Sequence, residues 1–216
     1  LSEVEALSRC SLFWRCFTNW LGGMGVLVFL LAIVPMTGGS NMNLMKAESP
    51  GPSVGKLVPK VRHTAIILYG IYIVLTVIEV ILLLFGKMDL YEALTTSFST
   101  AGTGGFGIYN DSFGSVSPYI QWVVGVFLVL FGVNFGVYFL ILMGKFKQAF
   151  SHEEMRVYLA VIFTATAIIV IDLRDTFATL GECIRHAFFQ VSSIITTAGF
   201  SSVDFNLWTD TSKTVL

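Results

Sequence analysis

The stretch Thr100–Gly107 constrains this chain more than any other, because a polar, glycine-rich turn interrupts two long apolar runs there. Four of its eight residues are glycine. Glycine reaches positive φ angles at no steric cost, so the backbone can turn its carbonyl groups out of line. At membrane depth such a turn is tolerated where it lines a water-filled path. The stretch therefore predicts a turn beside an aqueous path inside a membrane protein.

A near copy of this stretch follows at Thr196–Ser201. Gly105 and Gly199 are 94 positions apart in the sequence. At the same offset the matching pairs are Ala93 with Ala187, Ser99 with Ser193, Thr103 with Thr197, and Phe106 with Phe200. The shared motif is Thr-x-Gly-Phe at the end of two equivalent segments, and such an internal repeat decides the fold.

The composition is that of a polytopic membrane protein. Of 216 residues, 55% are hydrophobic and 12% are charged, with a mean hydropathy of +0.77. A soluble domain usually has about 25% charged residues. The net charge of −1 gives no sign of a nucleic-acid partner. The three cysteines have neither metal-ligand spacing nor a disulfide pattern, so we expect no cofactor. We expect the chain to be an internal piece of a longer protein.

Four segments are apolar and long enough to predict membrane spans of ~20 residues. They are Leu12–Met36, Thr64–Phe85, Pro118–Met143 and a fourth with its core at Val157–Ile171. Gly22-Gly23-Met24-Gly25 in the first is expected to allow close helix packing. Gly132–Gly136 interrupts the third, and Asn134 there must bond a neighbouring helix or water.

Two further segments predict helices too short to span. Asp89 with Glu92 has the spacing of a capping box and opens a helix that ends near Thr100. Thr179 with Glu182 opens the second, which continues to Ile195. A short helix followed by a glycine turn forms a re-entrant hairpin that enters and leaves on one side. The predicted fold class is an all-α membrane protein of repeated helix–pore loop–helix units, as in potassium channels.

The charges of the loops predict the orientation, because cytoplasmic loops carry more Lys and Arg. The loop 37–63 carries four Lys or Arg residues and the loop 144–156 carries three. The segment 86–117 carries only one. Both basic loops are therefore expected in the cytoplasm, with the glycine turns entering from outside.

The two turns have the chemistry of a cation filter. A short helix aimed into the membrane places partially negative carbonyl groups near its centre. A ring of such turns would replace the water shell of a cation. Divalent cations prefer carboxylates, which neither motif contains, so a monovalent ion is favoured. The predicted ion-binding residues are Thr103, Gly104, Gly105, Thr197, Ala198 and Gly199. Ordinary glycine-rich turns are the alternative, which two copies behind capped short helices make less favoured.

Several stretches together resemble the Trk/Ktr/HKT superfamily of potassium transporters, closest to the bacterial Trk-type uptake subunit. They are Thr103–Phe106, Thr197–Phe200, Trp14-Arg15 with Trp20–Gly25, and Gly132–Phe135. The resemblance covers essentially the whole chain. It implies potassium uptake across the bacterial plasma membrane by four repeats around one pore. It also implies a homodimer, a cytoplasmic nucleotide-binding regulatory subunit and no enzymatic activity.

The resemblance also implies how the chain divides into repeats. Residues 1–36 would hold the last transmembrane helix of repeat one, and 37–63 a cytoplasmic loop. Residues 64–144 would form the complete repeat two, followed by a cytoplasmic loop at 145–153. Residues 154–216 would form repeat three as far as its filter loop.

Two other functions were weighed on particular residues. A sodium- or proton-coupled carrier would use Glu79 or Asp172 as its coupling acid, but both acids lie towards helix ends. Glu79 is expected to pair with a neighbouring helix or to reach the interface. An intramembrane enzyme would need an inward-facing Ser/His or paired-Asp group. His186 is the only histidine near the membrane, and we expect it at the interface.

Overall fold

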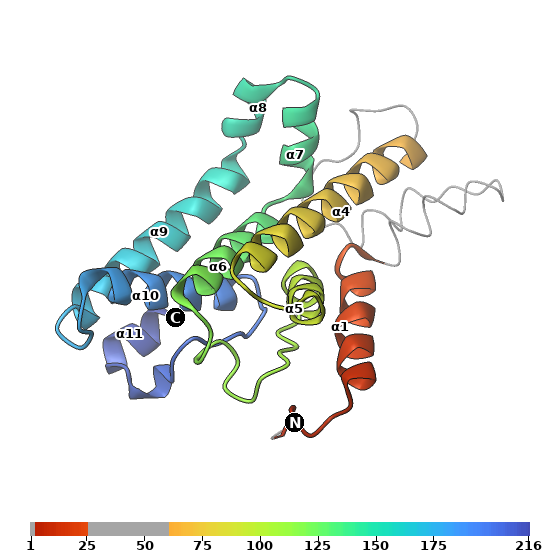
Figure 1. Cartoon of the computed structure of the whole chain (residues 1–216). Helices are drawn as coiled ribbons and strands as arrows, with labels where there is room; N and C mark the ends of the chain where they lie inside the picture. Colours follow the sequence, from red (N-terminus) through yellow and green to blue (C-terminus); the bar gives the residue numbers. More distant parts are fainter. Residues whose placement is uncertain (1–2, 26–60) are drawn as a thin grey trace.

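The computed structural model describes residues 3–25 and 61–216, and the described part is built of helices (Figure 1). The second half of the predicted first span and most of the predicted loop 37–63 lie outside the described residues. The helices are α1 (Arg9–Gly23), α4 (Val61–Phe85), α5 (Leu90–Ala101), α6 (Pro118–Gly132), α7 (Phe135–Leu142), α8 (Phe146–Phe150), α9 (Glu153–Leu173), α10 (Leu180–Ile195), a 3₁₀ turn η2 (Phe205–Leu207) and α11 (Asp210–Val215). The all-α class is as predicted.

Two helices are long and apolar enough to cross a membrane, at Ala65–Phe85 and Glu153–Leu173. They match the second and fourth predicted spans. The predicted third span, Pro118–Met143, is broken where its interruption was predicted, and α6 and α7 meet there at an angle of 86°. Val133 is extended between them, and the Asn134 side chain caps α7 by accepting the Gly136 N–H at 2.8 Å. The predicted interruption is confirmed, and it takes the form of a sharp bend.

The first helix begins earlier than the predicted first span, and only the first part of that span lies among the described residues. Ser8 caps α1 by accepting the Ser11 N–H, and α1 ends at Gly23, while the predicted end at Met36 lies outside the described residues. Met24 leaves the helix and Gly25 has φ +74°, a conformation that favours glycine. The packing role predicted for the glycines is confirmed at Gly23, where a Cβ would lie 2.6 Å from Gly102 Cα. It is wrong at Gly22, which has open space.

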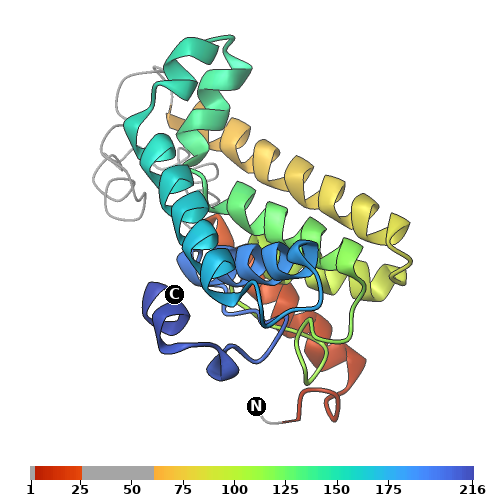
Figure 2. The same cartoon turned by 90° about the vertical axis from the view of Figure 1, so that its left-hand side faces the viewer.

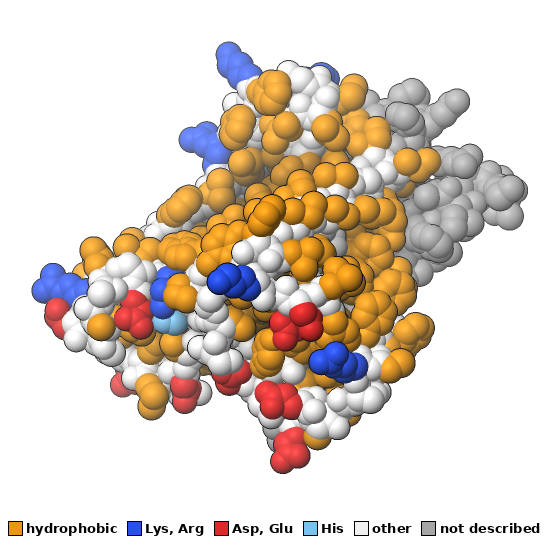
Figure 3. Space-filling view, viewed as in Figure 1, with side chains coloured by type: hydrophobic (Ala, Val, Ile, Leu, Met, Phe, Trp, Pro, Cys, Tyr) orange, Lys and Arg blue, Asp and Glu red, His pale blue; other side chains and the backbone are white. Residues whose placement is uncertain are grey.

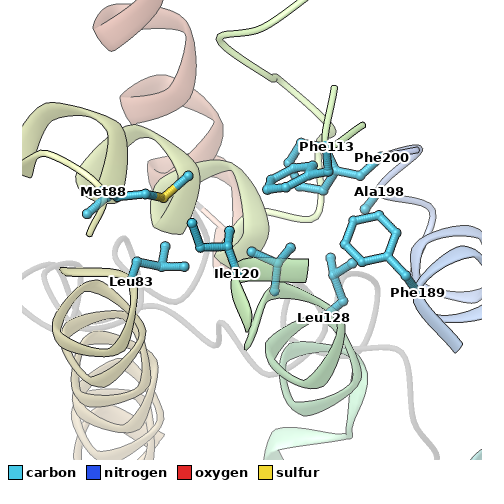
Figure 4. Packing of buried hydrophobic residues seen from close by; sticks show 10 residues of the cluster. Leu83, Met88, Phe113, Ile120, Leu128, Phe189, Ala198 and Phe200 are labelled. Atoms are coloured by element: carbon cyan, nitrogen blue, oxygen red, sulfur yellow. The ribbon is translucent and has the colours of Figure 1, made fainter. Parts of the chain in front are cut away.

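The helices form two adjoining groups. α5 packs against α1 and α4, and α10 packs against α6 and α9 (Figures 1 and 2). One buried cluster joins the two groups: it contains Leu83 of α4, Ile120, Val124 and Leu128 of α6, Phe189 of α10, and Met88, Ala93, Phe113, Ala198 and Phe200 (Figure 4). Burying one large apolar side chain stabilises a fold by about 1.5–3 kcal/mol. This cluster therefore fixes the two groups relative to each other.

The surface is dominated by apolar side chains, with charged groups near its edges (Figure 3). On α4 the exposed apolar residues include Val74, Val77 and Ile81, and on α9 they include Phe163 and Ile171. Water would penalise such a face, whereas lipid tails would not. The two helices therefore present the outward surface that a bilayer requires.

Candidate functional site

The two glycine turns have the same backbone hydrogen bonds. In the first, the N–H groups of Gly102, Thr103 and Gly104 donate to the carbonyl oxygens of Phe98, Thr100 and Ser99, at 3.0, 3.0 and 3.2 Å. In the second, Thr196, Thr197 and Ala198 donate to Ser192, Ile194 and Ser193, at 3.3, 2.9 and 2.9 Å. Every donor and acceptor of one turn lies 94 positions from its counterpart. The sequence repeat is thus also a repeat of backbone structure.

The dihedral angles repeat as well. Thr103 and Gly105 have φ of +46° and +67°, and Thr197 and Gly199 have +59° and +80°. A threonine with positive φ is uncommon because its β-branched side chain crowds the backbone. Such conformations cost of order 1–3 kcal/mol and persist where the surroundings impose them, often at functional sites. Both turns therefore have positive φ angles at the same two positions, with backbone strain at the threonine of each.

Each turn follows a short helix whose start is capped. Asp89 accepts the Glu92 N–H at 2.6 Å, and Glu92 accepts the Asp89 N–H at 3.2 Å, so the predicted capping box is confirmed. Thr179 accepts the Glu182 N–H at 3.2 Å, which forms half of the second predicted box. The 12 and 16 residues of α5 and α10 span roughly 18 and 24 Å, short of the ~30 Å hydrocarbon layer.

The fold brings the two turns together. A Cβ on Gly105 would overlap the carbonyl oxygen of Ala198, so the two backbones touch there. Beyond the turns, the Phe113 N–H donates to the Ser201 carbonyl at 2.8 Å. The Phe113 and Phe200 rings meet edge to face at 4.8 Å, as Figure 4 shows. The two turns that contain the six predicted ion-binding residues, 103–105 and 197–199, therefore lie against each other.

The first turn is held by α1, from the face that carries Arg15, Cys16 and Asn19. The Arg15 guanidinium lies over the Phe106 ring at 4.9 Å, and the Cys16 thiol donates to the Phe106 carbonyl at 3.3 Å. Asn19 fills the space beside Gly104, where a Cβ would overlap its carboxamide. Sequence reasoning missed these contacts, although the spacing 15, 16 and 19 places the three residues on one helix face.

A second feature that the sequence analysis missed is the hydroxyl-rich interior of α5. Its buried residues include Thr95, Thr96, Ser97, Ser99 and Thr100. The Thr95 and Thr100 hydroxyls donate to carbonyls one turn earlier in the helix. Seven consecutive positions, Leu94–Thr100, contain five of these hydroxyls, so the run itself was the available signal.

The two candidate coupling acids lie in different environments. Glu79 was predicted either to pair with a neighbouring helix or to reach the membrane interface. Its side chain is 0% exposed, so the second of these two alternatives is wrong. Asp172 accepts hydrogen bonds from the Thr209 and Ser212 hydroxyls and so holds α11 against α9. Asn134 was predicted to bond either a neighbouring helix or water. Its carboxamide donates to the Glu154 carboxylate of α9 at 3.0 Å, so it bonds a neighbouring helix.

His186, which was predicted at the membrane interface, is buried within the protein on α10. Its Nδ1 lies 2.9 Å from the Ser202 hydroxyl, and its ring stacks on Phe177. Burial lowers the pKa of His186, as does the charge of Arg185, while Glu182 acts in the opposite direction. The neutral imidazole therefore ties α10 to the segment after the second turn.

The donor set of the site is neutral. Both turns contain only threonine, glycine, alanine and phenylalanine within the motif. Among the described residues no group of three or more His, Cys, Asp or Glu side chains is placed to hold a metal ion. The oxygens at hand are backbone carbonyls and the hydroxyls of Thr103 and Thr197, which suit a weakly held monovalent cation.

Spanning helices, short re-entrant helices and paired glycine turns define a membrane transport protein of the pore-loop kind. The chain belongs to the TrkH cation transport protein family, whose profile matches residues 1–216. Membership confirms the predicted superfamily, the transport class and a multi-pass protein of the bacterial inner membrane.

Relatives and a solved structure agree with this membership. The chain is 36% identical over 213 residues to the Trk system potassium uptake protein TrkH of Escherichia coli K12, covering 96% of this chain and 44% of that protein. It is 29% identical to TrkG of the same organism, with the same shares covered. The crystal structure of the potassium transporter TrkH from Vibrio parahaemolyticus matches with a TM-score of 0.77 at 27% identity, over 94% of this chain and 41% of that one. The chain thus spans less than half the length of these relatives.

Proposed function

We propose that this chain is part of a potassium uptake protein and that its two glycine turns form part of the selectivity filter. The ion would be held by the carbonyl groups of residues 103–105 and 197–199, with the hydroxyls of Thr103 and Thr197 beside them. The observation that carries the proposal is the repeated backbone of the two turns, joined where Gly105 meets Ala198. An accidental pair of glycine-rich turns would not share three hydrogen bonds and two positive φ angles, one of them on a threonine.

The electrostatics of the short helices support the same conclusion. The C-terminal ends of α5 and α10 carry the negative ends of their helix dipoles, equivalent to about half an elementary charge each. Both ends lead directly into the turns. Since neither motif contains an ionised group, the site would attract a cation without binding it too tightly to release.

The arrangement also supports a ring of more than two turns. Gly105 abuts the carbonyl of Ala198, whereas a Cβ on Gly199 would have open space within 4 Å. In a ring of equivalent turns, Gly199 would face the corresponding carbonyl of a further repeat. We propose four repeats, with residues 1–36 ending repeat one, 64–144 forming repeat two and 154–216 forming repeat three as far as its filter. The basic loops 37–63 and 145–153 would lie in the cytoplasm.

The decisive experiment is ion flux into liposomes that contain the full-length protein. Potassium is expected to enter well ahead of sodium, and the truncated chain 1–216 is expected not to conduct, because two turns cannot surround an ion. Equal entry of both ions would contradict the proposed selectivity. Selective currents from the truncated chain would contradict the need for further repeats.

The proposed orientation and partners have separate tests. Cysteines placed at Lys56, Lys147 and Asp111 can be labelled with an impermeant reagent on intact cells. Only Asp111→Cys is expected to react, and labelling of Lys147→Cys alone would reverse the orientation. By resemblance, the full-length protein is also proposed to form a homodimer with a cytoplasmic nucleotide-binding subunit, which the mass of the purified complex would show.

A further inference from the structure

Ser193 lies in the last turn of α10, and its side chain is 0% exposed. A buried hydroxyl needs a hydrogen-bonding partner, and within a helix the nearest one is the carbonyl group one turn earlier. Ser192 and Thr196 use that partner, and their hydroxyls donate to the carbonyls of Phe188 and Ser192 at 2.7 and 2.6 Å. Ser193 donates forward instead, to the Phe200 carbonyl at 2.7 Å. Its hydroxyl is therefore directed at the end of the second glycine turn.

The backbone of Ser193 also holds the middle of this turn. Its carbonyl oxygen accepts the N–H groups of Ala198 at 2.9 Å and of Gly199 at 3.3 Å. One residue thus binds the backbone of three consecutive residues, 198–200. Gly199, with φ of +80°, has few steric limits on the rotation of its peptide groups. The hydrogen bonds on either side therefore decide where the carbonyl groups of Ala198 and Gly199 point.

The first turn has the equivalent serine but not the equivalent bond. The residue 94 positions before Ser193 is Ser99, which is also 0% exposed. Its hydroxyl has no hydrogen-bonding partner among the described residues. The Phe106 carbonyl, the counterpart of the Phe200 carbonyl, accepts the Cys16 thiol at 3.3 Å. The donor at this position therefore comes from α1 in the first turn and from the preceding short helix in the second.

A second difference concerns the carbonyl groups of the two motif glycines. In the first turn, the Gly107 N–H donates to the Gly105 carbonyl at 2.9 Å. The counterpart of Gly107 is Ser201, whose N–H donates to the Ser112 hydroxyl at 3.1 Å. The Gly105 carbonyl thus has a backbone bond of its own, whereas among the described residues the Gly199 carbonyl has none. The direction of the Gly199 carbonyl depends more heavily on the serine of α10.

We infer that Ser193 is a positioning residue of the second glycine turn, and that Cys16 provides the corresponding hydrogen bond in the first. By binding residues 198–200 on both sides of the Gly199 peptide group, Ser193 keeps the carbonyl groups of this turn directed at the proposed ion site. Ser193 does not touch the ion. The inference rests on the proposed function, since its effect is read as a change of ion selectivity.

The test measures the potassium/sodium permeability ratio of the full-length protein in liposomes, with the amount of inserted protein as a second readout. Ser193→Ala removes the hydroxyl and is expected to lower the ratio roughly two- to ten-fold, the effect of one lost hydrogen bond, while the protein still inserts. Ser193→Cys keeps a weaker donor at the same place and is expected to lower the ratio less.

Two serines supply matched controls. Ser192→Ala removes the neighbouring buried hydroxyl, which bonds within α10, and Ser99→Ala removes the hydroxyl that has no partner. Both variants are expected to keep the parent's ratio. In the first turn, Cys16→Ala is expected to lower the ratio less than Ser193→Ala, because a thiol is a weak donor and the Gly105 carbonyl keeps its bond to Gly107.

A filter variant separates failure of this inference from failure of the proposed function. If Gly199→Ser lowers the ratio but Ser193→Ala inserts normally and keeps it, the inference fails while the proposed function stands. If Ser192→Ala or Ser99→Ala lowers the ratio as much as Ser193→Ala, the loss is not specific to the bond with Phe200, and the inference fails as well. If Ser193→Ala does not insert, Ser193→Cys decides, and an unchanged ratio in that variant overturns the inference.

Discussion

The two glycine turns share a backbone but not the side chains that support it. Phe106 of the first turn is 36% exposed and is contacted by Arg15 and Cys16 of α1, whereas Phe200 of the second is 1% exposed and packs in the central cluster. The Phe200 carbonyl accepts the Ser193 hydroxyl at 2.7 Å. The repeated part is therefore the backbone that would meet the ion, while each turn has its own scaffold.

This difference explains what a sequence repeat can and cannot establish. Backbone carbonyls are the same in every residue, so a filter built from them needs the same φ angles and tolerates different neighbours. The neighbours need only hold those angles. The first turn is held by polar and cation–π contacts from α1, the second by apolar burial of Phe200 and the Ser193 hydroxyl, and the two should respond differently to substitution.

The largest contrast is expected between the two phenylalanines of the motifs. Phe200→Ala should destabilise the full-length protein by about 3–5 kcal/mol, as deletion of a buried aromatic ring does. Phe106→Ala should cost only about 1 kcal/mol, because its ring is partly exposed and loses mainly the Arg15 contact. Thermal unfolding in detergent measures both. Equal losses would contradict the difference in support between the turns.

The next effect concerns the contact of α1 with the helix end beneath the first turn. Gly23→Ala should cost about 1–3 kcal/mol, because the added Cβ would meet Gly102 and force a local shift. Gly22→Ala is the matched control on the same helix and faces open space, so it should stabilise the helix by up to ~1 kcal/mol. Yield and thermal unfolding of the two variants should separate clearly. A greater loss in Gly22→Ala would mean that α1 is rotated relative to the structure.

A smaller effect is expected at Arg15. Arg15→Gln removes the guanidinium from the Phe106 ring and should cost about 0.5–1 kcal/mol. Combined with Phe106→Ala it should add little, because both changes remove the same contact. A double-variant cycle measured by thermal unfolding tests this. Fully additive losses would show that Arg15 acts elsewhere.

The smallest effect is a pH dependence near the second turn. Because the pKa of His186 is lowered from its usual value of about 6.5, folding favours the neutral imidazole. The stabilisation is complete above that value and is lost as the pH falls through the lowered pKa. Arg185 opposes protonation, Glu182 favours it, and Ser202 and Phe177 contact the ring. His186→Asn should therefore show a smaller drop in unfolding temperature between pH 7.5 and 5 than the parent. An equal drop in both would place the pH dependence in other groups.

Much of the fold could be predicted from local patterns. The apolar runs predicted α4 and α9, and the cap at Asp89 fixed the start of α5. The sharp bend between α6 and α7 could not be predicted to that degree. The pattern Gly132–Gly136 marks an interruption, but its angle depends on the Asn134 bonds to Gly136 and Glu154. The bond to Glu154 depends on how α9 packs against this bend, which no local pattern encodes.

The same limit applies to the site. The repeat located both turns because a conformation with positive φ leaves a local signal in glycine. The side chains that hold the two turns in place leave a weaker signal in the sequence. Arg15 and Asn19 act through contacts between α1 and the first turn, and the prediction for Glu79 left open whether it pairs with a neighbouring helix or reaches the interface. Burial of a lone acid follows from how three helices meet, which no local pattern encodes.

The central claim is that the glycine turns select the ion, and one measurement tests it most directly. The potassium/sodium permeability ratio of the full-length protein is compared for Gly105→Ser, Gly199→Ser and the control Gly22→Ser. A side chain at either turn would re-aim the carbonyl groups, so both filter variants should insert in normal amounts with a lowered ratio and fail to support growth on low potassium. Gly105→Ser should have the larger effect, because Ala198 leaves its side chain no room. Gly22→Ser should keep the ratio. If both filter variants insert normally and keep the parent's ratio, the turns are not the selectivity element.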